Sequence, residues 1–143
     1  MTTEQNKAIV RRFFEAFESN DETAMKEVLA ADLVAYTHGA PGPLSREAML
    51  QGISWWNASF SDSRFTIEEQ IAEGDKVATH VTMRALHSRG DFQGLPPSGK
   101  QVEMRSVTIE RIKDGKIVER RVIGGWLGMM QQLGLIPSPQ PAR

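Results

Sequence analysis

The spacing of apolar residues changes once along this chain, near Ser61, and that change limits the folds open to it. Before Ser61, apolar residues recur three and four positions apart, which is typical of helices with one buried face. After it, they alternate with polar residues, which is typical of strands with one buried face. Helices followed by strands, rather than helices alternating with strands, predict an α+β fold with a mainly antiparallel sheet.

The first half of the chain carries the start signals of three helices. Thr2 and Gln5 have the spacing of a capping box at the start of the first helix. Asn20 or Asp21 can cap a short second helix, and Ser45 can cap a third. The apolar face of the first helix consists of Ile9, Val10, Phe13, Phe14 and Phe17.

A short strand is expected around residues 33–36, and four further strands in the second half of the chain. Asp114-Gly115 predicts a tight hairpin between the last two strands. The four strands are expected over residues 65–71, 77–87, 102–112 and 117–123.

Gly124 and Gly125 should end the last strand, and a short helix should follow from Trp126 to Leu133. Helices packed on one face of a strongly curved sheet would form a cone with an apolar interior. We expect one domain over residues 1–143, with residues 138–143 as a frayed tail.

Composition and charge exclude several classes of partner. The chain has no cysteine, which excludes a disulfide scaffold and a thiolate zinc site and favours the cytoplasm. It has 17 Lys and Arg against 18 Asp and Glu, which gives no general reason to bind nucleic acid. No apolar run approaches the roughly 20 residues needed to cross a membrane. The three histidines lack the spacing of a metal site, so no metal is expected.

His87 is the best candidate for a general base. It shares the apolar face of its strand with Met83, and its unperturbed pKa of about 6.5 lies near working pH. A histidine on an apolar face is more often structural, so that interpretation stays open.

Trp55 and Trp56 are about 100° apart on a helix, so at least one should face the sheet. It would either pack in the core or stack on a flat ligand.

An inward arginine is also expected in the last strand. Arg120 and Arg121 point to opposite sides, so one should lie in solvent and the other should face inward. Strict alternation places Arg121 inward with Gly125, where it could bind an anion unless it pairs with Glu119. A slipped register would instead make Arg105 the inward cation.

Four segments carry a resemblance to a known family. The first two are residues 10–17 of the opening helix and residues 65–77. The third is His87 with residues 92–100, which contain Pro-Pro-Ser-Gly-Lys, and the fourth is residues 114–119 with residues 127–134, Leu-Gly-Met-Met-Gln-Gln-Leu-Gly. With these, the chain resembles the SnoaL-like polyketide cyclases, or ester cyclases, of the nuclear transport factor 2-like superfamily. The resemblance implies a cone-shaped α+β barrel, a pocket between helices and sheet, and a homodimer formed through the sheet. It also implies an intramolecular aldol condensation without a metal or organic cofactor.

The chain departs from the family pattern at the acid/base residue. The family has an Asp at the end of the last strand, and Gly125 occupies that position here. His87 does match the histidine that precedes the family's Pro-Pro loop. Three hypotheses therefore stand: a cofactor-independent cyclase, isomerase or hydrolase acting on a small or aromatic carbonyl compound; a non-catalytic small-molecule-binding protein; and an assembly partner.

The expected pocket has apolar walls and a small hydrophobic or aromatic ligand, with an anionic ligand as one alternative. Its floor should consist of Val81, Met83, Met104 and Ile123, and its walls of Phe13, Phe17 and Trp56. The expected substrate-binding residues are Tyr36, His38, Trp55, Trp56, Met83, Met104, Arg121 and Gly125. A homodimer is also expected from the apolar outward set Ala78, Leu86, Val107 and Ile109.

Overall fold

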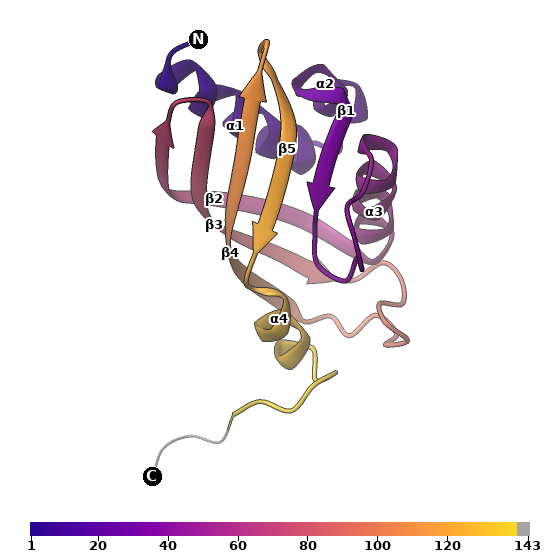
Figure 1. Cartoon of the computed structure of the whole chain (residues 1–143). Helices are drawn as coiled ribbons and strands as arrows, with labels where there is room; N and C mark the ends of the chain where they lie inside the picture. Colours follow the sequence, from indigo (N-terminus) through magenta and orange to yellow (C-terminus); the bar gives the residue numbers. More distant parts are fainter. Residues whose placement is uncertain (140–143) are drawn as a thin grey trace.

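A computed structural model describes residues 1–139 and confirms the α+β order (Figure 1). Helices α1 (Thr3–Glu18) and α2 (Glu22–Val28) precede the first strand, α3 (Arg46–Ser59) lies between the first and second strands, and α4 (Trp126–Gln132) follows the last strand. The strands are β1 (Leu29–Tyr36), β2 (Phe60–Glu73), β3 (Lys76–His87), β4 (Gln101–Lys113) and β5 (Lys116–Ile123). Ser138 and Pro139 are exposed, and the rest of the expected tail, residues 140–143, lies outside the described residues.

The helices begin where their capping residues predict. Thr2 and Gln5 form both hydrogen bonds of a capping box at the start of α1. The side chains of Asp21 and Ser45 each accept a hydrogen bond from the backbone N–H three residues on, which starts α2 and α3. These caps satisfy N–H groups that the first turn of a helix cannot pair internally.

The sheet has five strands in the order β1-β5-β4-β3-β2 (Figure 1). Strands β2 to β5 form an antiparallel meander, and β1 pairs with β5 in parallel at one edge. Strand β2 begins at Phe60, earlier than expected. A register shift between Ser61 and Arg64, with Asp62 at φ 55°, interrupts the alternation there and so obscures the start of the strand in the sequence.

The inward face of β5 differs from the prediction. The pairing of β4 with β5 shifts between Arg111 and Ile112, which changes the phase of the alternation along β5. Arg120 is therefore buried, whereas Arg121 and Ile123 are exposed. The expectation that Arg121 and Ile123 face inward is wrong for this reason.

Two apolar clusters fill the interior. The larger one lies between α1, α2, α3 and the inner face of the sheet and includes Val10, Phe13 and Leu29. The smaller one includes Phe60, Val102 and Met129, and it seats α4 against the end of the sheet. The space between the helices and the sheet remains partly open, and this is where the candidate site lies.

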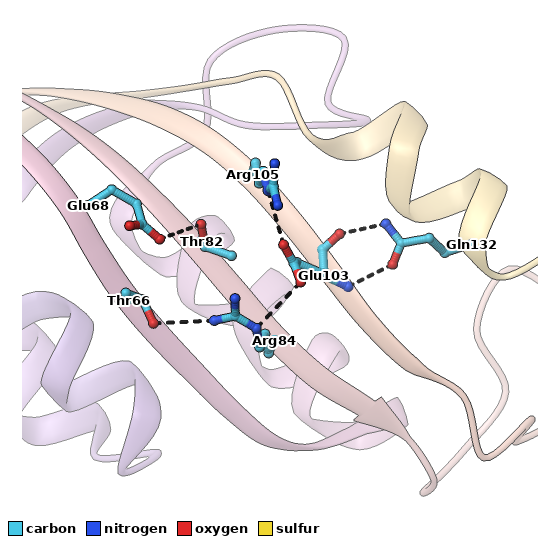
Figure 2. Close-up of polar contacts among 7 residues, drawn as sticks. All are labelled: Thr66, Glu68, Thr82, Arg84, Glu103, Arg105 and Gln132. Atoms are coloured by element: carbon cyan, nitrogen blue, oxygen red, sulfur yellow. Dashed lines mark hydrogen bonds and ion pairs between the residues drawn. The ribbon is translucent and has the colours of Figure 1, made fainter. Parts of the chain in front are cut away.

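Near α4, the outer face of the sheet is polar across β2, β3 and β4 (Figure 2). Glu103 of β4 pairs with Arg105 at 3.0 Å and with Arg84 of β3 at 3.5 Å. The side-chain amide of Gln132 donates to the backbone carbonyl of Glu103 and accepts from its N–H, both at 2.7 Å (Figure 2). This double contact fastens α4 to β4, which gives a structural role to the second glutamine of the Gln-Gln-Leu-Gly segment.

Within residues 1–139, no helix has the length and apolar character needed to cross a membrane.

Candidate functional site

A cavity of about 860 Å³ opens between α3, the inner face of the sheet and the loops at its mouth. Its walls are mainly apolar and aromatic: Phe17, Ile53, Trp56, Val81, Met83 and Met104 are among them. A cavity of this size and lining suits a small organic molecule. The polar groups that face it are few, and they include His38, Ser106, Thr108 and Arg120.

Most of the apolar residues predicted for the pocket line the cavity, and Phe13 does not. Val81, Met83, Met104, Phe17 and Trp56 lie on the cavity wall, and Trp55 lies at its rim with 68% of its surface exposed. Trp56 is held flat against Phe60, with ring centroids 3.8 Å apart, and its indole N–H donates to Ser63. Phe13 instead belongs to the larger apolar cluster.

Arg120 extends from β5 to the cavity wall and is held by a buried carboxylate. Its Nε donates to Oε2 of Glu110 at 3.1 Å, and the Thr108 hydroxyl donates to the other carboxylate oxygen at 2.9 Å. The Glu110 side chain is fully buried and that of Arg120 is 10% exposed. Burial raises the pKa of Glu110, and the charge of Arg120 opposes that effect. Burial lowers the pKa of Arg120, and Glu110 opposes that change in turn, so the two form one coupled pair.

His38 follows β1 and lies half-buried at the cavity. Its ring stacks on Trp126, with centroids 5.4 Å apart and an interplanar angle of 19°. Burial lowers the pKa of His38, and the charge of Arg120 lowers it further. Neither ring nitrogen has a hydrogen-bond partner among residues 1–139, and Nε2 is fully buried. A neutral imidazole without a hydrogen-bond partner in the described part of the chain therefore lies at the cavity wall.

His87, in contrast, uses both ring nitrogens to hold a loop. Nε2 lies 2.8 Å from the carbonyl oxygen of Gly90, while Nδ1 lies 3.0 Å from the Ser98 hydroxyl and accepts from the Ser98 N–H at 3.3 Å. The backbone donor fixes the tautomer with the proton on Nε2. The side chain is fully buried against Phe60 and Phe92 and is absent from the cavity wall.

Tyr36 and Arg121 lie together on the outer face of the sheet. The guanidinium of Arg121 stands 4.1 Å above the ring of Tyr36, and its Nε donates to Glu119 at 3.1 Å. The Arg121 side chain is 46% exposed, and that of Arg105, the alternative inward cation, is 75% exposed. The structure therefore brings neither Tyr36, Arg121 nor Arg105 into the cavity.

Comparison with known proteins agrees with the fold. The family model described as SnoaL-like polyketide cyclase matches residues 7–133. The chain belongs to this family. It is 28% identical to the aklanonic acid methyl ester cyclase DnrD of Streptomyces peucetius over 137 residues, which cover 93% of this chain and 92% of that protein. It is 32% identical to the nogalonic acid methyl ester cyclase of Streptomyces nogalater over 89 residues, or 62% of this chain and 66% of that protein.

Solved structures of other proteins share the SnoaL-like fold. IdmH, a putative polyketide cyclase from Streptomyces antibioticus, is 33% identical with a TM-score of 0.81, covering 91% of this chain and 99% of IdmH. AclR, a putative hydroxylase from Streptomyces galilaeus, is 25% identical with a TM-score of 0.86, covering 97% of this chain and 87% of AclR. The expected SnoaL-like fold is thus confirmed.

In this SnoaL-like chain, Gly125, the position that we expect to correspond to the family's Asp, has no room for a side chain. Its φ is 87°, in the left-handed region that favours glycine. An added Cβ would lie 2.5 Å from Met104 Cγ, 2.6 Å from the Arg105 carbonyl oxygen and 2.7 Å from Ser106 Oγ. Gly125 itself lines a shallow hollow beside α4 rather than the large cavity. Restoring an Asp would therefore require a different backbone path.

Three residues that line this SnoaL-like cavity are not predictable from the sequence pattern. Strict alternation along β5 predicts that Arg120 points outward, but the structure places it inward. Trp126 follows the Gly124-Gly125 turn, and its place in a short helix gave no signal of which way it points. Thr108 is an ordinary strand residue whose hydroxyl matters only because Glu110, two residues on, is buried.

Proposed function

We propose that this chain is a cyclase-type enzyme that closes a ring in a flat, polyketide-like carbonyl compound by acid–base chemistry, without a cofactor. Family membership and the shape of the cavity support the class of reaction. The observation that carries the proposal is His38: an unpaired, half-buried imidazole at the cavity, next to a buried cation and a flat aromatic wall.

The residues at the cavity can catalyse an intramolecular aldol condensation. Neutral His38 would take a proton from the carbon beside a carbonyl, and the resulting enolate would be delocalised over the conjugated substrate. The enolate carbon would attack a second carbonyl of the same molecule, and a carbon–carbon bond would form. The new alkoxide would then take the proton back from the imidazolium. Trp56 and Trp126 provide flat walls that can hold the two carbonyls in a reactive orientation.

The test is turnover of the methyl esters named for the relatives. Aklanonic acid methyl ester and nogalonic acid methyl ester are incubated with the wild type, His38→Gln and His80→Gln, and ring closure is followed by liquid chromatography. His80 is an exposed histidine of β3 and serves as the matched control. Loss of a general base should slow ring closure by about 100-fold or more in His38→Gln alone. Equal rates in all three proteins, or no ring closure of either ester, would contradict the proposal.

A second candidate function is a non-catalytic binding protein, and Gly125 favours it. The backbone at Gly125 leaves no space for the family's acid/base side chain, so the cavity could persist as a ligand site without its chemistry. Binding of both esters without any ring closure, in the wild type as well as in His38→Gln, would support this alternative.

We also infer that two copies of the chain pair through the outer face of the sheet. Val107 and Ile123 are register partners on adjacent strands, and Ile71, Ala78 and Ile109 continue the apolar surface across β2, β3 and β4. Ile71 is 61% exposed, Ile123 53% and Val107 38%, which is unusual for a contiguous solvated face. We call these five residues the outer apolar patch.

A further inference from the structure

We propose that the cavity binds a free carboxylic acid through Arg120 more tightly than it binds the corresponding methyl ester, the form for which the relatives are named. This proposal rests on the proposed function only in taking the cavity as the substrate site. It concerns the class of substrate, and its test does not depend on ring closure.

Arg120 has hydrogen-bond donors left for a ligand. A guanidinium carries five N–H groups. Within the described part of the chain, Arg120 donates from Nε alone, to Glu110, and its Nη1 and Nη2 atoms have no hydrogen-bond partner. The side chain lies on the cavity wall, so these terminal N–H groups can meet a bound molecule there. Two parallel N–H groups match the two oxygens of a carboxylate.

Several contacts hold the guanidinium in place before a ligand arrives. Glu110 binds its Nε, Thr108 binds the other oxygen of Glu110, and the ring of Phe13 lies 4.8 Å from its central carbon. A side chain fixed in this way loses little conformational entropy when an anion binds. The buried Glu110 thus acts as a positioning residue for Arg120.

No other cation competes for an anion at this cavity. Among the wall residues in the described part of the chain, Arg120 is the one Arg or Lys, and the acidic Asp91 is exposed. His38 is kept neutral by burial and by Arg120 itself. An acid group on the ligand would therefore be directed to Arg120, and the ring system would extend along Trp56 and Trp126.

A methyl ester cannot replace the acid in this contact. It has no charge, and its methyl group blocks one of the two oxygens that a paired contact needs. Hydrogen bonds between charged groups contribute enough to favour the acid by about ten- to hundredfold in Kd. The wild type should therefore bind an acid more tightly than its own methyl ester.

The experiment compares aklanonic acid with aklanonic acid methyl ester by isothermal titration calorimetry. The wild type should bind the acid at least about tenfold more tightly. The double variant Arg120→Met/Glu110→Gln, which removes the cation without leaving its carboxylate buried alone, should lose this preference and keep its affinity for the ester. Arg121→Met, a change in the adjacent exposed arginine, should keep the wild-type preference and is the matched control.

Equal affinity of the wild type for the two compounds, or no binding of either, would overturn the proposal without any variant. An acid preference that survives in the folded double variant would overturn it as well. If the double variant does not fold, Arg120→Lys keeps the charge but lacks the planar fork, and it should show a reduced acid preference.

Ring closure measured in the same samples separates the two proposals. An Arg120-dependent acid preference without ring closure supports the acid site and contradicts the cyclase function. Ring closure with equal affinity for acid and ester supports the cyclase function and overturns the acid site.

Discussion

His38 combines the two properties that a general base in this cavity needs, which are a free nitrogen and a neutral ring. Its pKa is lowered by burial first and by the charge of Arg120 second. The imidazole therefore stays neutral to a lower pH than a free histidine, whose pKa is about 6.5. The ring can accept a proton throughout the neutral range.

The pH dependence of ring closure should report this lowered pKa. The acid limb of kcat/KM should rise with an inflection below about 6.5, the ordinary pKa of histidine. In Arg120→Met/Glu110→Gln the charge of Arg120 is gone, so the inflection should move to higher pH. An inflection at or above 6.5 in the wild type would contradict the assignment of His38.

The lowered pKa of His38 also predicts how the free energy of unfolding changes with pH. Between the lowered folded pKa of His38 and about 6.5, the unfolded chain binds more protons than the folded one. The free energy of unfolding should therefore increase as the pH rises through that window, and His38→Gln should remove this contribution.

Gly125 should tolerate substitution much less well than Gly124. Both have positive φ, 87° and 81°, so Ala at either position is strained. Only at Gly125 would the added Cβ also meet three atoms at 2.7 Å or less, whereas the nearest atom to a Cβ at Gly124 is 3.8 Å away. Gly124→Ala should cost about 1 kcal/mol and Gly125→Ala about 2 kcal/mol or more, measured by urea unfolding. Equal costs would show that packing does not exclude a side chain there.

The arginine pair shows what the sequence could and could not predict about single residues. Adjacent residues of a strand face opposite sides, so one inward arginine was predictable from Arg120-Arg121 alone. Which of the two it is depends on the shift in pairing between β4 and β5, at Arg111 and Ile112. Nothing in the local residue pattern reveals that shift.

The segment between β3 and β4 is held at both ends by His87. Its hydrogen bonds to Gly90 and Ser98 fix residues 88–100, and Phe92 of this segment packs against Trp56 and Trp126 at the cavity. The sequence predicts His87 as a general base, but its hydrogen bonds to Gly90 and Ser98 favour a role in positioning this segment.

Replacing His87 should therefore affect stability. His87→Gln should lower the free energy of unfolding by about 1–3 kcal/mol, because buried partners lose their hydrogen bonds. Hydrogen exchange in residues 88–100 should become faster, whereas His80→Gln, on the outer face of the sheet, should leave the exchange of these residues at the wild-type rate. Wild-type stability together with complete loss of ring closure would instead support His87 as the base.

The elements themselves were largely predictable because their signals are local. The capping residues Thr2, Asp21 and Ser45 start their helices where expected, and Asp114-Gly115 forms the predicted turn between β4 and β5. The parallel pairing of β1 with β5 was not predicted, because it joins segments about 90 residues apart and no local pattern encodes it.

Residues 1–139 leave the outer apolar patch uncovered, and pairing with a second copy would bury it. Multi-angle light scattering at micromolar concentration should give twice the mass of one chain. Ile123→Glu places a charge in the patch and should shift the mass toward that of one chain. Ile136→Glu, in an exposed isoleucine of the segment after α4, should not. A single-chain mass for the wild type would contradict the dimer.

The central claim is that the cavity is the substrate site and that His38 and Arg120 act there. A crystal structure with aklanonic acid bound tests it most directly. We predict a ring system between Trp56 and Trp126, the carboxylate on Arg120 and a His38 ring nitrogen within about 3.2 Å of the reacting part of the ligand or of a bridging water. A ligand bound outside the cavity, or inside it without contact to either residue, would contradict the account.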